Sequence, residues 1–185
     1  MMTRVCALMR GINVNGIAIK MAELKAAFAE MGYPDAKTLL ATGNVVFSIP
    51  DGASLEETKS KLEQGLSERF GYEAHLFLRG EKEIEEAIQQ ADAVEVPKEY
   101  HLYWFLCEEE GLPGELLQKY QEMPSSLEGE RFWIEGDSAY WIVPKGSTLS
   151  SDFGSKVLGA KRYRDKLTSR NLNTVRKISE ALKGK

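Results

Sequence analysis

Cysteine and histidine are both scarce in this sequence, with two residues of each among 185. Cys6 and Cys107 stand far apart and form no CxxC pair, which excludes a zinc finger or a disulfide framework. Each cysteine lies within an apolar run, where a lone thiol behaves as a small hydrophobic group. His75 and His101 also begin apolar runs, so we interpret them as ordinary strand residues rather than ligands. We therefore expect neither a bound metal nor a cofactor.

Long apolar runs are absent as well. None approaches the roughly 18 residues that a membrane-spanning helix requires. The first apolar stretch is too short for a signal peptide, and Arg10 interrupts it. These absences predict a cytoplasmic protein with no membrane partner.

Charge is distributed unevenly along the chain. The net charge of −4 disfavours a general nucleic-acid binder. Residues 51–144 carry 22 acidic and 8 basic side chains, whereas residues 145–185 carry 11 basic and 3 acidic ones. Either the basic end lies on the acidic middle of the same molecule, or it binds an anionic partner. The sequence leaves both interpretations open, and it does not fix the oligomeric state.

The first half of the chain has the element order of a ferredoxin-like domain. Short apolar or β-rich runs bounded by polar residues predict strands, and apolar residues at steps of three and four predict helices between them. A Gly-Asn pair joins two of the strand runs and is typical of a hairpin. The resulting order is β-α-β-β-α-β. The predicted strands are 3–9, 36–41, 45–49 and 73–78.

The second half repeats this order as β-α-β-β-α, with a strand at 101–107, a hairpin across 136–137 and a mostly helical tail. We expect an α+β fold of two subdomains. Residues 1–91 form the ferredoxin-like subdomain, and residues 92–185 form a second α+β subdomain with a C-terminal helical tail. The polar, proline-containing stretch 92–100 is the expected boundary.

A candidate site follows from the topology of the first half. In the ferredoxin-like order the first two strands run parallel, so the loop after the first strand and the hairpin turn share one edge of the sheet. Polar residues gather in both segments, and an arginine fork, open glycines and free helix N–H groups suit an anion. The alternative is that Asn-Gly and Gly-Asn only make tight turns. The candidate ligand-binding residues are Arg10, Gly11, Asn13, Asn15, Lys20, Thr42, Gly43 and Asn44.

A second polar set lies near the C-terminus. The sequence “TSRNLNTVRKISEAL” predicts a helix over 168–182 that Thr168 or Ser169 caps. Arg170, Asn171 and Thr174 then lie within one turn. Either they belong to a solvated helix face, or they join the first set in one shared cleft, which is the hypothesis we adopt.

Three motifs in order, “LMRGINVNG…IKMAEL”, “TGNVVF” and “TSRNLNTV”, resemble the bacterial family catalogued as domain of unknown function 1697. The resemblance implies two ferredoxin-like parts but no activity. This chain has Thr42 where the family often has serine, and Leu172 where it often has tryptophan. The family's polar motifs correspond here to Arg10, Gly11, Asn13, Lys20, Gly43, Asn44, Thr168, Arg170, Asn171 and Thr174.

The function that these observations favour is binding of a small anionic ligand, phosphorylated or carboxylated, with a nucleotide among the possibilities. Lacking a visible nucleophile–base pair, the sequence leaves catalysis open. The alternatives are RNA binding and a protein-interaction module without catalysis. RNA binding is disfavoured, because the first sheet offers only Phe47 for stacking on bases.

Overall fold

A computed structural model describes residues 1–12, 17–123, 127–164 and 166–184. The chain divides by contacts into two units, Met1–Glu85 with Arg176–Lys185, and Glu86–Val175. These ranges differ from the predicted 1–91 and 92–185, since the C-terminal residues group with the first unit. Two helices contain the points of division, namely α3 (Glu81–Asp92) and α6 (Leu172–Leu182). The subdomain ranges 1–91 and 92–185 stay a prediction.

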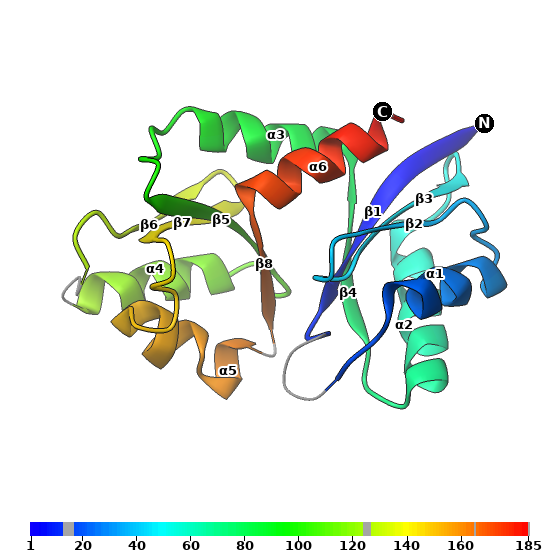
Figure 1. The fold of residues 1–185 in the computed structure, drawn as a ribbon, viewed down its shortest axis with the longest axis horizontal. Coiled ribbons are helices and arrows are strands. Elements are labelled where there is room, and N and C mark those ends of the chain that lie inside the picture. The colour runs from blue at the N-terminus through cyan, green and yellow to red at the C-terminus, as the bar shows by residue number, and fades with distance from the viewer. Residues whose placement is uncertain (13–16, 124–126, 165, 185) are drawn as a thin grey trace. The chain divides into compact units, whose positions relative to one another are not determined.

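Unit 1 is a four-stranded antiparallel sheet in the order β2-β3-β1-β4, with α1 and α2 on one face (Figure 1). This strand order with β-α-β-β-α-β connections is ferredoxin-like, as the sequence predicts. Ser54 caps α2 by accepting a hydrogen bond from the Glu57 N–H at 3.2 Å. The elements are β1 (Met2–Arg10), α1 (Met21–Glu30), β2 (Lys37–Leu39), β3 (Asn44–Pro50), α2 (Leu55–Phe70) and β4 (His75–Gly80).

The core of unit 1 lies between the sheet and its two helices. Alternate β1 residues Val5, Ala7 and Met9 face the helices, as expected for the two-residue period of a strand. Phe28 of α1 and Phe47 of β3 meet edge to face with ring centroids 5.2 Å apart. The other face of β1 is also buried, and there the Arg4 guanidinium donates to the Ala181 carbonyl of α6 at 3.0 Å. The C-terminal residues therefore contact the second face of this sheet.

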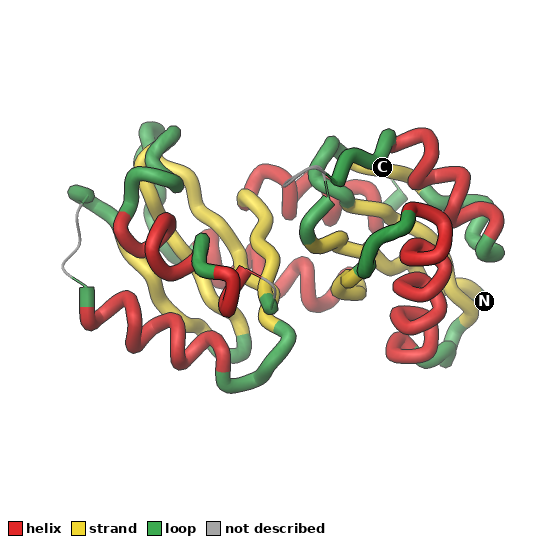
Figure 2. Tube along the Cα trace, turned by 90° about the horizontal axis from the view of Figure 1, so that it is seen from below, coloured by secondary structure: helices red, strands yellow, loops and turns green. Residues whose placement is uncertain are grey.

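Unit 2 has the same architecture, with strand order β6-β7-β5-β8 and antiparallel neighbours throughout. Figure 2 shows α4 running alongside this sheet. On the opposite face the Tyr140 hydroxyl donates to Gln90 of α3 at 2.7 Å. The elements are β5 (Tyr100–Cys107), α4 (Leu112–Glu122), β6 (Arg131–Glu135), β7 (Ser138–Pro144), the π-helix η1 (Phe153–Leu158), α5 (Lys161–Arg164) and β8 (Leu167–Asn171).

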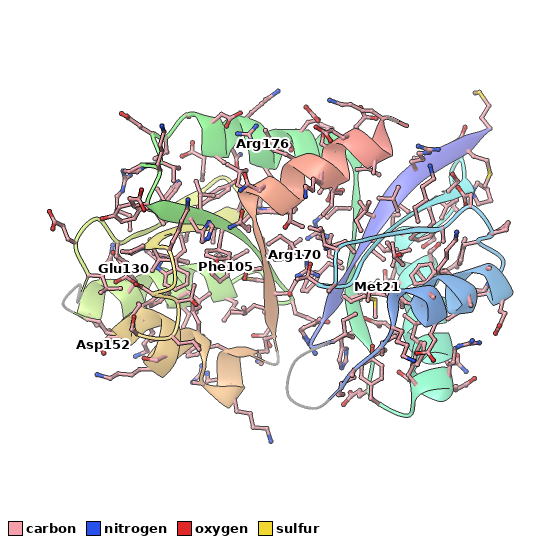
Figure 3. All side chains as sticks on the ribbon, viewed as in Figure 1. Met21, Phe105, Glu130, Asp152, Arg170 and Arg176 are labelled. Carbon is pink, nitrogen blue, oxygen red and sulfur yellow. The ribbon has the colours of Figure 1, made fainter. Side chains whose placement is uncertain are left out.

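An aromatic core and one buried carboxylate hold unit 2 together (Figure 3). Glu130 is 6% exposed and accepts hydrogen bonds from Trp141 Nε1 at 3.0 Å and from the Ser151 hydroxyl. Ser151 in turn accepts from the Gly154 N–H at 3.0 Å, which starts η1. Since β6 and β7 flank this carboxylate, Glu130 ties the sheet to the π-helix segment.

The structure corrects the prediction for the C-terminal region. The helix expected over 168–182 begins only at Leu172, because residues Leu167–Asn171 form β8. This strand pairs with β5 from Leu167 opposite Cys107 to Asn171 opposite Tyr103. Thr, Ser and Asn have low helix propensity, and a partner strand satisfies their backbone groups. Unit 2 thus has one strand more than predicted and completes the β-α-β-β-α-β order.

No helix in the described ranges is long and apolar enough to cross a membrane. Within the same ranges, His, Cys, Asp and Glu side chains form no group that could hold a metal ion.

Candidate functional site

The loop after β1 and the β2–β3 turn meet at one edge of the unit 1 sheet, as the topology predicts. The Met9 N–H donates to the Gly43 carbonyl at 2.8 Å. The Ile12 side chain lies directly against Gly43, where an added Cβ would come within 2.4 Å of Ile12 Cδ1. Residues more than 30 positions apart are thereby fixed side by side.

The turn itself spans residues 40–43, between the paired residues Leu39 and Asn44. Leu40 (φ 58°) and Gly43 (φ 72°) both have left-handed backbones. Asn44 is fully buried, and its amide donates to the Leu39 carbonyl at 3.0 Å and to Thr42 Oγ1 at 2.9 Å. Asn44 therefore closes the turn from inside, and a contact of Asn44 with a ligand stays a prediction.

Arg10 and Gly11 stand where β1 ends. Arg10 is half-buried and pairs across the ladder with His75, the first residue of β4. Gly11 is exposed, has φ 71°, and would have no atom within 4 Å of an added Cβ. A left-handed backbone with open space in front of it is a position at which a ligand can approach the main chain closely.

The other predicted residues of the first set differ in how the structure places them. Thr42 is exposed on the turn. Lys20 is exposed and precedes α1, where its backbone N–H donates to Glu23 at 3.4 Å. Asn13 and Asn15 lie outside the described residues. The edge thus combines one arginine, one lysine, a hydroxyl and accessible main chain.

The second predicted set lies in unit 2, at the end of β8 and the start of α6. Arg170 is 5% exposed, and its Nη1 donates to Thr168 Oγ1 and to the Ser169 carbonyl, each at 2.8 Å (Figure 3). Thr168 and Arg170 share one face of the strand, since they are two residues apart. The helical turn predicted for Arg170 and the cap predicted for Thr168 are therefore wrong, because both residues lie in β8. Buried Arg170 is held by its own strand.

Asn171, rather than Thr168 or Ser169, stands at the start of α6. Its Oδ1 accepts from the Asn173 N–H at 2.9 Å, which satisfies one of the helix's free donors. Its Nδ2 lies 2.9 Å from His101 Nδ1, and Asn171 stands opposite Tyr103 in the β5–β8 ladder. From the sequence, His101 is interpreted as an ordinary strand residue, and Tyr103 is not among the candidate ligand-binding residues. Both lie about 70 residues from Asn171, so no local spacing marks their proximity.

Two segments of unit 2 occupy the places that correspond to the loop after β1 and the β2–β3 turn. The loop after β5 contains Glu108, Glu109 and Glu110, and the β6–β7 turn is flanked by Glu135 and contains Asp137. These two segments of unit 2 carry acidic residues, and Lys166 pairs with Glu109 beside them, whereas the loop after β1 carries Arg10.

The thiols do not add a nucleophile to either unit. Cys6 is fully buried within β1. Burial raises the pKa of the Cys107 thiol to about 11, so this thiol is protonated at neutral pH.

A groove of about 290 Å³ opens along β4 in unit 1, apart from the predicted residues. Lys59 of α2 and Arg79 of β4 lie over the Phe77 ring there, each 5.8 Å from its centroid. The groove is lined by Leu55, Glu56, Lys59, Phe77, Leu78, Arg79 and Glu83. A cleft shared by the two predicted sets would combine residues of both units and stays a prediction.

Comparison with known proteins gives a family and a fold. A family model described as “Protein of unknown function (DUF1697)” matches residues 2–140. The conserved bacterial protein SP0830 from Streptococcus pneumoniae is similar in structure, with a TM-score of 0.72 and 24% identity over 99% of both chains. An unknown protein from Galdieria sulphuraria matches with a TM-score of 0.26 and 11% identity over 92% of this chain and 99% of that one. No curated protein matches this sequence.

Proposed function

The chain belongs to the DUF1697 family, and we propose that it binds a small anionic ligand, phosphorylated or carboxylated, at the edge of the unit 1 sheet. The observation that supports this most is the joining of the loop after β1 to the β2–β3 turn through Met9, Ile12 and Gly43. That packing holds Arg10 and Gly11 beside the turn that carries Thr42. A nucleotide falls within the proposed ligand class.

The chemistry of this edge favours an anion over a neutral ligand. A guanidinium offers several N–H donors in a planar fork that fits carboxylate or phosphate. The open main chain at Gly11 and the hydroxyl of Thr42 supply further hydrogen-bonding groups of the kind found in phosphate sites. Turn formation alone does not require a basic residue, and the corresponding edge of unit 2 makes its turns with acidic ones.

The proposal extends to Thr168, Arg170, Asn171 and Thr174 of unit 2 as ligand-binding residues. Arg170 donates to two acceptors of β8, Thr168 Oγ1 and the Ser169 carbonyl. Its contribution is tested separately by the Arg170→Lys variant, which keeps the charge and loses the fork.

A thermal-shift screen with inorganic phosphate, nucleotides, sugar phosphates and acidic metabolites tests the proposal. A ligand at 100 times its dissociation constant should stabilise the protein by about 2.7 kcal/mol. We expect Arg10→Ala to abolish this stabilisation while the unliganded protein keeps its melting temperature. Lys25→Ala is the matched control, because Lys25 is an exposed cation on α1 of the same unit.

Two results would contradict the proposal. One is a ligand-induced shift that is equal in the wild type and Arg10→Ala. The other is a loss of about 1–3 kcal/mol in the unliganded Arg10→Ala protein with no ligand that stabilises the wild type, which would give Arg10 a structural role.

RNA binding receives no support from the positions of the aromatic side chains. Phe47 is 1% exposed in the unit 1 core, and Trp104 and Trp141 are each 3% exposed in unit 2, whereas Trp133 is half-buried and lies against Tyr140. Stacking on unpaired bases requires accessible rings. Filter binding with mixed RNA at low salt tests this alternative, which predicts an affinity that falls steeply as salt rises.

A further inference from the structure

The outer side of β4 lines part of the groove in unit 1. This strand stands at the end of the sheet order and pairs with β1 within that sheet. Main-chain groups alternate between the two sides of a strand, so every second N–H of β4 points away from β1. The Leu76 N–H donates to the Glu63 carboxylate at 3.0 Å, and the Gly80 N–H donates to that of Glu83 at 2.9 Å. Side-chain carboxylates therefore cover two of the outward N–H groups.

Leu78 lies midway between these two donors and differs from them. Its N–H points outward as well, because Leu76 and Gly80 each stand two residues away. Within the described residues this N–H donates to no acceptor, while the Leu78 carbonyl accepts from Arg79 Nη1 at 2.8 Å. The Leu78 side chain is buried in the unit 1 core, so its main chain is the part that meets the groove. The groove thus contains a main-chain donor.

Two cations line the groove together with this donor. Lys59 of α2 and Arg79 of β4 each lie 5.8 Å from the centroid of the Phe77 ring. The Lys59 ammonium is 3.8 Å from the Glu63 carboxylate. Arg79 Nε is 3.4 Å from the Glu83 carboxylate. Ion pairs of this kind between partly exposed side chains contribute little to stability, so a ligand carboxylate can compete for both cations.

The remaining surface of the groove includes apolar side chains that suit the hydrocarbon part of a ligand. Phe77 is buried, and Leu55 at the start of α2 is an exposed leucine. The volume of about 290 Å³ is at the small end for ligand sites. An added peptide strand fits less well, because strand addition uses a row of free main-chain groups and side chains already cover the groups on both sides of the Leu78 N–H.

We propose that this groove binds a small organic carboxylate with an apolar body. The ligand's carboxylate accepts from the Leu78 N–H and pairs with Lys59 and Arg79. This repeats the contact that the protein's own carboxylates make with the neighbouring outward N–H groups. The apolar body lies on Phe77 and Leu55. All these residues belong to unit 1, and none is among those proposed above to bind an anion, so the site does not depend on that proposal.

Amide NMR of the ¹⁵N-labelled chain tests the site, with the Leu78 N–H as the reporter. Benzoate is the probe, benzyl alcohol is its neutral counterpart, and acetate has the carboxylate without the ring. We expect benzoate to move the Leu78 amide proton saturably to lower field at neutral pH and constant ionic strength, because a charged acceptor polarises the N–H. Acetate should bind about tenfold more weakly, since the ring of benzoate buries roughly 60 Å² of apolar surface. Benzyl alcohol should leave the Leu78 amide in place.

A pair of lysine variants separates the groove from general charge effects. Lys59→Met removes the ammonium and keeps an apolar stem, so it should weaken benzoate binding about tenfold, the effect of losing one hydrogen bond between charged groups. Lys25→Met is the matched control, because Lys25 is exposed on α1 of the same unit, and it should leave the affinity unchanged.

The inference is overturned by a Leu78 amide that does not respond to benzoate, by an equal response to benzyl alcohol, or by equal affinities of Lys59→Met and Lys25→Met. A short β-branched peptide, blocked at both ends, that moves the Leu78 amide more than benzoate does would assign the outer side of β4 to strand addition instead. In Arg10→Ala the benzoate response of Leu78 should persist. Its loss in that variant would place the carboxylate at the loop after β1 and refute a site in the groove.

Discussion

Substituting Gly43 by alanine tests how tightly the loop after β1 packs against the β2–β3 turn. An added Cβ would lie 2.4 Å from Ile12 Cδ1 and 2.8 Å from Met9 Cβ. The first contact involves the end of a side chain, which can move. The second involves an atom fixed by the β1 backbone, so relief there requires the strand or the turn to shift.

Gly11→Ala provides a matched control within the same unit. Gly11 and Gly43 have nearly the same backbone angle, φ 71° and 72°, but Gly11 has no atom within 4 Å of an added Cβ. Alanine in the left-handed region costs about 1–2 kcal/mol, and the lower entropy of the unfolded chain offsets about 0.4–1 kcal/mol of this. Gly11→Ala should therefore destabilise by about 1 kcal/mol. Overpacking adds about 1–3 kcal/mol at Gly43, for a total of about 2–4 kcal/mol.

Urea denaturation followed by far-ultraviolet circular dichroism measures both losses. All three tryptophans are in unit 2, so tryptophan fluorescence would not report unit 1 directly. In an Ile12→Ala background the cost of Gly43→Ala should fall by about 1 kcal/mol, because two of the three nearest atoms are removed. Equal losses for Gly11→Ala and Gly43→Ala would refute the packing of the loop on the turn.

Three further predictions follow from buried groups. Burial raises the pKa of Tyr72 and of Tyr140 to about 12, so these two should remain protonated when the other phenols ionise. Both tyrosines hold their protons more tightly in the folded protein than in the unfolded chain. Their contribution to stability is therefore complete below about pH 10 and is lost between about pH 10 and 12. An ultraviolet titration in which all seven tyrosines ionise together would contradict this. The Cys107 thiol, with its pKa raised to about 11, should react with iodoacetamide at neutral pH far more slowly in the folded protein than in urea, and equal rates would argue against its burial. Glu130→Ala should reduce the free energy of unfolding by about 2–4 kcal/mol, because two donors lose their acceptor. Glu130→Gln keeps an acceptor oxygen and should reduce the free energy of unfolding by less. Equal losses of stability in the two variants would show that hydrogen bonding to Glu130 is not the cause.

The order of elements in unit 1 could be predicted because each element has a local signal. The β1 run is apolar and short, and α2 has a serine at its N-cap. The β2–β3 turn was less predictable. It starts at Leu40, whose φ of 58° has no sequence signal, since leucine seldom adopts a left-handed backbone. As a result β2 ends at Leu39, earlier than its β-rich run implies.

The strand β8 was missed because its partner is distant in sequence. The apolar stripe of α6 gives a strong helical signal. The sequence just before it contains no residue that clearly ends a helix, so the predicted helix was extended backwards over “TSRN”. The helix begins after Asn171 because that side chain caps the Asn173 N–H and the preceding residues pair with β5. Contacts of Asn171 with Tyr103 and His101 fix the start of the helix, and these residues lie about 70 positions away in the sequence.

The two units show why the fold alone does not identify a ligand. Their sheets have the same strand order and connections, so the loops after β1 and β5 and the two hairpin turns are topologically equivalent. One pair carries Arg10 and the other carries Glu108, Glu109 and Glu110. The shared backbone requires turns at these places but no particular charge. A fold shared with another protein at 24% identity is equally uninformative about the ligand. The side chains at the edge of unit 1 are therefore where a function for this chain has to be sought first.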